Sequence, residues 1–150
     1  MSNIEVEVVL ARIQAIRKYL ERLQEFESLT LQEYINDFDT QLIVERLIQL
    51  LTEASLDINK YLLTQLGILP SRDNWKNKEY FLEAAKQKIL TEELAQKLAQ
   101  AVGMRNILVH RYLDINLEIV FGAIHECLTY YPIYLRQITN YLDSLETEND

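Results

Sequence analysis

An arginine, a histidine and a tyrosine stand close together in the second half of the chain, and their types suit acid–base chemistry on a phosphodiester. Arg105 is separated by four residues from His110, and Tyr112 comes two positions later. An imidazole titrates near neutral pH and can take or give a proton, while a guanidinium presents a planar fork of donors that fits phosphate oxygens. Such a pair suits the cleavage of RNA by the substrate's own 2′-hydroxyl, because that reaction needs no nucleophile from the protein.

The spacing also restricts how these side chains can meet. Successive residues of a helix are turned by about 100°, so His110 lies roughly 140° from Arg105 and one straight helix cannot aim both at one point. Cap signals at Asp114 and Asn116 therefore predict that the helix ends near His110–Tyr112. The motif offers one histidine where proton transfer needs both an acid and a base, so a symmetric homodimer with two motifs is the economical arrangement.

The other histidine and the single cysteine are assigned to structure. His125 falls on the last predicted helix and is interpreted as a surface or packing residue, and Cys127 as a small core residue. A lone cysteine excludes an internal disulfide and is typical of a reducing cytosol. No cluster of Cys and His has metal-ligand spacing, so we expect no metal site.

The composition predicts a single domain over residues 1–150. The chain is 49% hydrophobic and contains only three Gly and two Pro, and a scarcity of breakers favours long helices over short strands. No apolar run approaches the ~18–20 residues that span a membrane, and the N-terminus lacks the basic-then-apolar order of a signal peptide. We therefore expect a cytoplasmic protein without a membrane segment.

Charge is distributed unevenly along the chain. The net charge of −8 disfavours non-specific binding of nucleic acid. Residues 72–111 carry eight Lys and Arg against five Asp and Glu, a local net charge of +3, which leaves −11 for the remainder. Two interpretations stay open: ordinary scatter over solvated helix faces, or a local region that attracts anions.

Hydrophobic residues recur at helical spacing through most of the chain. Five helices are predicted, over residues 4–28, 40–66, 78–89, 91 to the motif, and 117–145, with a short turn over 30–36. Thr30, Asp37 and Thr91 are expected to cap the segments that follow them, Gly67 to end the longest helix, and Pro132 to kink the last one. Short connections make neighbouring helices antiparallel, so the predicted fold class is all-α, an antiparallel bundle of about five helices.

The longest predicted helix also carries two acidic residues, Glu53 and Asp57. They lie four positions apart and therefore share one face of the helix. By themselves they fit a solvated acidic pair with Lys60 nearby.

Three stretches together resemble a known family. Arg105-Asn106, three residues, then His110-Arg111-Tyr112 is similar to the signature of HepT-like toxins, which belong to the HEPN superfamily of all-helical ribonucleases. Glu53-Ala54-Ser55-Leu56-Asp57-Ile58 is similar to a stretch on the family's long helix, and the segment from Thr91 to Met104 to its next-to-last helix. The resemblance covers roughly residues 40 to 135.

This resemblance implies a toxin of a type VII toxin–antitoxin system. Such toxins are homodimeric, metal-independent endoribonucleases, with tRNA as the target class and with two motifs facing each other across a cleft. Arg105 and His110 would be the catalytic pair, with no cofactor of their own. Glu53 and Asp57 would orient one of them, and Asn106 would stabilise the helix end.

The resemblance also implies a means of control. A cognate MntA-like nucleotidyltransferase antitoxin would use ATP and magnesium to attach AMP to Tyr112, which would place a negative phosphate where the RNA phosphate binds.

Two other interpretations compete with this one. The same helical dimer could be a non-catalytic binding partner of a minimal nucleotidyltransferase, or a binder of a nucleotide. A third interpretation is a purely structural bundle in which Arg105 and Asp57 form a buried ion pair. Replacing His110 by alanine separates catalysis from binding, because only catalysis needs the imidazole.

Overall fold

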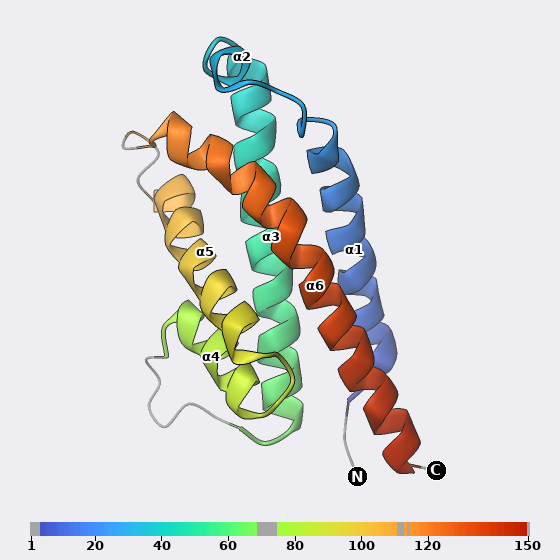
Figure 1. Ribbon diagram of the computed structural model, residues 1–150. Helices are drawn as coiled ribbons and strands as arrows, with labels where there is room; N and C mark the ends of the chain where they lie inside the picture. The colour runs from blue at the N-terminus through green and yellow to red at the C-terminus, as the bar shows by residue number, and fades with distance from the viewer. Residues whose placement is uncertain (1–3, 69–74, 111–112, 114, 150) are drawn as a thin grey trace.

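The computed structural model describes residues 4–68, 75–110, 113 and 115–149, and these residues form a helical bundle (Figure 1). Its helices are α1 (Val6–Gln24), α2 (Leu31–Ile35), α3 (Phe38–Gln65), α4 (Asn77–Lys86), α5 (Glu92–His110) and α6 (Leu117–Asn149). The described part contains no strand, so the predicted all-α class is confirmed. The chain rises in α1, descends in α3, rises in α5 and descends in α6, which gives the predicted antiparallel arrangement (Figure 1).

Helix α3 is the centre of this bundle, because it contacts each of the other five helices. At 28 residues it is about 42 Å long. Helices α1 and α6 pack on one side of it and α4 and α5 on the other (Figure 1). None of the helices in the described ranges is both long and apolar enough to cross a membrane.

The predicted caps set the starts of the helices. Thr30 Oγ1 accepts from the Glu33 N–H at 3.1 Å and the Glu33 carboxylate accepts from the Thr30 N–H at 3.0 Å, a reciprocal capping box that starts α2. Asp37 caps α3 through the Thr40 N–H, and Thr91 caps α5 through the Leu94 N–H. The short polar signals in the sequence therefore place these helix starts correctly.

Two helices end with the same backbone turn. After α3, Gly67 has φ 78°, and the Ile68 N–H donates to the Leu63 carbonyl at 2.9 Å, as in a Schellman motif. After α4, Lys88 takes the equivalent place with φ 61°. The first ending confirms the prediction for Gly67; the second is less visible in the sequence because a non-glycine residue holds the left-handed conformation.

The last helix is longer than predicted. Asn116 Oδ1 accepts from the backbone N–H groups of Glu118 and Ile119 at 3.0 and 3.2 Å and so caps α6, whereas Asp114, the alternative cap, lies outside the described residues. Pro132 sits inside α6, and the helix continues past it and curves across the bundle (Figure 1). A proline removes one backbone donor, and packing against α1 and α3 holds the helix together around it.

A buried polar layer joins α3 to α6. Thr52, Ser55 and Asn59 of α3 are almost completely buried. The Tyr134 hydroxyl lies 2.7 Å from Asn59 Oδ1 and 3.0 Å from the Ser55 carbonyl oxygen, and the Tyr131 hydroxyl donates to Thr52 Oγ1 at 3.4 Å. Buried polar groups need such partners, so this layer fixes how α3 and α6 are rotated against each other.

Candidate active site

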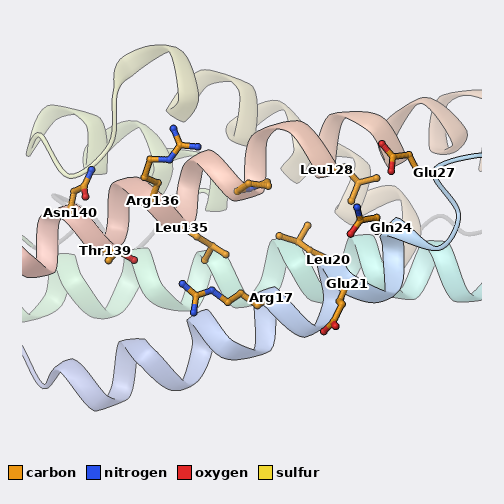
Figure 2. A pocket seen from close by; sticks show the side chains of 11 residues that line it. Arg17, Leu20, Glu21, Gln24, Glu27, Leu128, Leu135, Arg136, Thr139 and Asn140 are labelled. Carbon is orange, nitrogen blue, oxygen red and sulfur yellow. The ribbon is translucent and has the colours of Figure 1, made fainter.

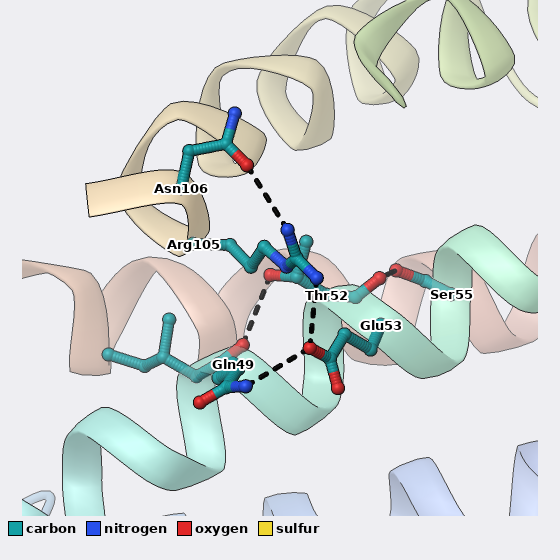
Figure 3. A network of polar contacts seen from close by, with 7 residues as sticks. Gln49, Thr52, Glu53, Ser55, Arg105 and Asn106 are labelled. Carbon is teal, nitrogen blue, oxygen red and sulfur yellow. Dashed lines mark hydrogen bonds and ion pairs between the residues drawn. The ribbon is translucent and has the colours of Figure 1, made fainter. Parts of the chain in front are cut away.

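Arg105 is held on α5 by a short chain of polar contacts that begins on α3. Its Nη2 donates to Glu53 Oε1 at 3.1 Å and its Nη1 donates to Asn106 Oδ1 at 3.3 Å (Figure 3). Glu53 Oε1 also accepts from Gln49 Nε2 at 3.1 Å. The Arg105 side chain is 20% exposed and that of Glu53 34%, so the ion pair is only partly screened by water.

The sequence places these groups for simple geometric reasons. Gln49 and Glu53 are four residues apart on α3 and therefore stand one above the other on one helix face. Helix α5 packs against α3, which brings Arg105 to a carboxylate 52 positions away in the chain. Asn106 accepts a hydrogen bond from its neighbour Arg105, and its expected role in stabilising the helix end stays a prediction.

Asp57 does not join this network. Its Oδ2 lies 3.9 Å from Arg12 Nε on α1, and both side chains are largely exposed, at 57% and 41%. Lys60 also turns elsewhere, with Nζ 5.1 Å from the centre of the Tyr80 ring. The buried Arg105–Asp57 ion pair of the structural interpretation is therefore wrong, because Arg105 pairs with the acid one turn earlier.

The described part of α5 runs to His110, and Ile115 and Asn116 are no longer helical. The helix therefore ends between His110 and Ile115, which is compatible with the predicted end near His110–Tyr112. The side chain of His110 lies outside the described residues, and so do Arg111 and Tyr112. The relative placement of the Arg105 and His110 side chains thus stays a prediction. What the structure adds is the fixed position of the guanidinium just over one helical turn before His110.

Arg105 keeps spare hydrogen-bonding capacity. A guanidinium has five N–H donors, and Arg105 uses two of its nitrogens on Glu53 and Asn106. Its Nε is buried and has no hydrogen-bond partner among the described residues. The Arg105 side chain is nevertheless 20% exposed, so the remaining N–H groups of its two terminal nitrogens are the donors that suit an additional acceptor such as a phosphate oxygen.

The other reactive residues match their structural assignments. His125 is exposed on α6, with its ring edge-on to Phe121 at a centroid distance of 6.3 Å. Burial raises the pKa of the Cys127 thiol to about 12, so the thiolate needed for nucleophilic chemistry does not form near neutral pH. In the described ranges no group of three or more His, Cys, Asp or Glu residues could hold a metal ion.

Sequence reasoning missed one surface near the site. Large apolar side chains are exposed on α2, at the start of α3, at Leu113 and near the start of α6. The backbones of α2, the start of α3 and the start of α6 lie at the same end of the bundle (Figure 1). We call these side chains the apolar end; they are Ile35, Phe38, Leu42, Leu113 and Ile119, between 41% and 84% exposed. Helical periodicity does not reveal such a surface, because only the packed bundle shows which apolar positions stay uncovered. Exposed apolar clusters mark interaction surfaces.

Comparison with known proteins identifies the family. A family model described as "Ribonuclease HepT-like" matches residues 16–138. The chain belongs to the HepT-like ribonucleases. It is 46% identical to the tRNA nuclease HepT of Aphanizomenon flos-aquae, over all of both chains. It is 27% identical to the mRNA nuclease HepT of Shewanella oneidensis, with 95% of this chain and 98% of that protein covered.

The fold of this HepT-like ribonuclease is also shared with a solved structure. The tri-AMPylated Shewanella oneidensis HEPN toxin in complex with MNT antitoxin matches with a TM-score of 0.78 and 25% identity, covering 89% of this chain and 97% of the toxin. These matches confirm the predicted family, the HEPN-like fold, the endoribonuclease class and the function as a HepT toxin.

Proposed function

We propose that this HepT-like ribonuclease cleaves tRNA with Arg105 and His110, working as a homodimer. The observation that carries the proposal is the fixed guanidinium: Glu53 and Asn106 orient Arg105 on α5, five residues before His110. The choice of tRNA rests on the 46% identity with a tRNA nuclease over the full length. The relative with 27% identity is an mRNA nuclease, so cleavage of tRNA and of mRNA should be measured side by side.

The proposed reaction is a transfer within the RNA backbone. One imidazole takes the proton of the 2′-hydroxyl, and the 2′-oxygen attacks the adjacent phosphorus. The bond to the 5′-oxygen breaks as the second protomer's imidazole returns a proton to that leaving group. The products are a 2′,3′-cyclic phosphate and a free 5′-hydroxyl. Arg105 stabilises the charge on the non-bridging oxygens while Glu53 holds the guanidinium in place.

Two motifs are needed for this proton balance, and the apolar end supports a dimer. Its five exposed side chains belong to α2, the start of α3, the start of α6 and Leu113, and these helix ends lie at the same end of the bundle as the last described turn of α5 (Figure 1). Burying them against a second copy would remove apolar surface from water and bring two α5 ends together. A twofold axis there makes the same surface serve both protomers.

Replacing His110 by alanine tests catalysis. The His110→Ala variant should lose tRNA cleavage and growth inhibition, because no other group supplies the proton transfers, while sedimentation still shows a dimer. His125→Ala is the matched control, since His125 is exposed on α6, and it should cleave at the wild-type rate. Full toxicity of His110→Ala would favour the non-catalytic binding partner instead.

We propose that Tyr112 is the point of control. The related HEPN toxin is tri-AMPylated and bound to an MNT antitoxin, which supports an MntA-like nucleotidyltransferase partner that consumes ATP with magnesium. The toxin itself would need no cofactor. An AMP group two residues from His110 would block RNA by size and by charge.

Intact-mass measurement tests this control. Protein made together with the antitoxin should gain mass in AMP units and lose cleavage, and Tyr112→Phe should gain none. Unmodified Tyr112 in a protein that an active antitoxin has nevertheless silenced would refute the assignment.

A further inference from the structure

A groove lies beside the motif, between the segment that leads into α4 and the face of α5 that it covers. Its volume is about 730 Å³. The residues that matter below are Trp75, Lys76, Lys78, Gln100, Gly103 and Asn106. The groove reaches Asn106, whose side chain accepts a hydrogen bond from Arg105. It is therefore continuous with the network that holds the catalytic arginine.

The charge of this groove sets it apart. Its described lining contains two lysines and no acid, and both lysines are exposed and form no ion pair with another described residue. The groove between α1 and α6 instead carries two arginines and two glutamates (Figure 2), and the groove between α5 and α6 one lysine and one glutamate. A smaller groove of about 370 Å³ after α4 has one lysine and no acid, so the groove beside Arg105 differs from it by having two lysines and about twice the volume. On a chain of net charge −8, an anion gains attraction there without an opposing acid.

The groove also contains the only tryptophan of the chain. Trp75 is half-buried, and its ring meets Tyr80 edge-on, with centroids 5.3 Å apart and planes at 73°. Lys60 covers the Tyr80 ring. Tyr80 therefore anchors one edge of the indole, while Trp75 still lines the open groove. A large aromatic ring beside lysines is the combination that binds single-stranded nucleic acid.

We propose that this groove is a nucleotide-binding subsite for the RNA that flanks the cleaved bond. In it, Trp75 stacks on a base, and Lys76 and Lys78 hold neighbouring backbone phosphates. The proposal rests on the ribonuclease function proposed above and names where its substrate continues. Stacking accepts any base, so the subsite adds affinity and fixes the path of the strand rather than reading its sequence.

The single tryptophan makes the subsite directly observable. The full-length protein is titrated with a 2′-O-methyl RNA oligonucleotide, which cannot be cleaved because it lacks the 2′-hydroxyl. Binding is followed by the anisotropy of a dye on the oligonucleotide, and tryptophan emission is recorded in parallel. Emission from Trp75 should fall along the same binding curve. Unchanged emission at saturation, or no binding by an enzyme that still cleaves tRNA, overturns the subsite and leaves the ribonuclease function standing.

Substitution of the ring tests stacking. Trp75→Leu should raise KM for tRNA roughly tenfold with kcat nearly unchanged, and Trp75→Phe should restore most of the affinity because it keeps an aromatic face. Equal KM values for both variants and the wild type would overturn the stacking role. The tryptophan emission of the wild type decides the matter even if the leucine variant folds poorly.

Charge reversal tests the phosphate contacts against a matched control. The double variant Lys76→Glu and Lys78→Glu should bind tRNA at least tenfold more weakly, with a salt dependence whose slope is smaller by about 1.4. The control reverses Arg17 and Lys18, which are exposed on α1, a helix without contacts to α4 or α5. Equal weakening in both variants would mean that overall charge, not this groove, binds RNA. Unchanged RNA affinity with lost binding to the nucleotidyltransferase would mark the groove as a protein surface, which also overturns the proposal.

Discussion

Two carboxylates on α3, one helical turn apart, pair with arginines from two different helices. Glu53 meets Arg105 of α5 at 3.1 Å, and Asp57 meets Arg12 of α1 at 3.9 Å. The first pair is partly buried and is extended by Gln49 and Asn106, whereas the second pair is open to water. A carboxylate and an arginine thus form an oriented site at Glu53–Arg105 and an exposed surface pair at Asp57–Arg12.

The difference shows what makes an ion pair useful for chemistry. An exposed pair contributes little, since water screens it and both side chains remain free to move. The Glu53–Arg105 pair has neighbours on both sides, so the direction of the guanidinium is fixed before a substrate arrives.

Of the substitutions in the two ion pairs, removal of each arginine should give the largest difference in cleavage rate. Arg105→Ala should lower kcat for tRNA cleavage by about 100-fold or more, because it removes the donor that stabilises the developing charge. Arg12→Ala should leave kcat within twofold of wild type. Single-turnover cleavage assays measure both, and a comparable loss in the two variants would contradict the assignment of the catalytic arginine.

Neutralising the acids should give a smaller separation. Glu53→Gln keeps the size of the side chain but weakens its hold on Arg105, so cleavage should fall roughly tenfold, since positioning groups near a catalytic residue carry effects of this order. Asp57→Asn should cleave like the wild type. The two rates can be compared at equal, saturating tRNA. If Asp57→Asn is as slow as Glu53→Gln, then Asp57 also orients a catalytic residue, and its exposure to water does not separate it from Glu53 in function.

The buried polar layer between α3 and α6 should affect stability rather than cleavage. Tyr134→Phe removes the hydroxyl that serves Asn59 and the Ser55 carbonyl, and the free energy of unfolding should fall by about 1–3 kcal/mol. Tyr130→Phe is the control, because Tyr130 is only half-buried. Urea titrations measure the free energy of unfolding of both variants. We expect kcat for tRNA cleavage to be the same in both variants as in the wild type. A Tyr134→Phe variant that is as stable as the wild type but cleaves tRNA more slowly would contradict the assignment of the polar layer to stability.

Local signals in the sequence predicted the helices well. Thr30, Asp37 and Thr91 cap helices as expected, since a cap depends on residues within one turn. The partners of Glu53 and Asp57 were not predictable in the same way. Both acids share a face of α3, and which neighbouring arginine each meets depends on where α1 and α5 pack.

The groove beside Arg105 and the apolar end are harder to predict from a single sequence than the helices are. Periodicity assigns an apolar residue to a helix face, but Phe38 at the start of α3 is 67% exposed, because the other described residues leave its ring uncovered. Trp75 falls in a stretch that reads as an ordinary polar loop. Its proposed role follows only from the fold, which places Trp75 and Asn106 in one groove.

The polar layer between α3 and α6 has a consequence for the genetics of this toxin. Thr52 faces Tyr131 in the core, and the next residue, Glu53, faces Arg105. A mutation that rotates α3 to improve the Thr52–Tyr131 contact also displaces Glu53 from Arg105. The active site and the buried core therefore cannot change independently of each other. Cells selected to survive the toxin without its antitoxin should therefore carry escape mutations not only at the motif but also along the buried face of α3 and the tyrosines of α6.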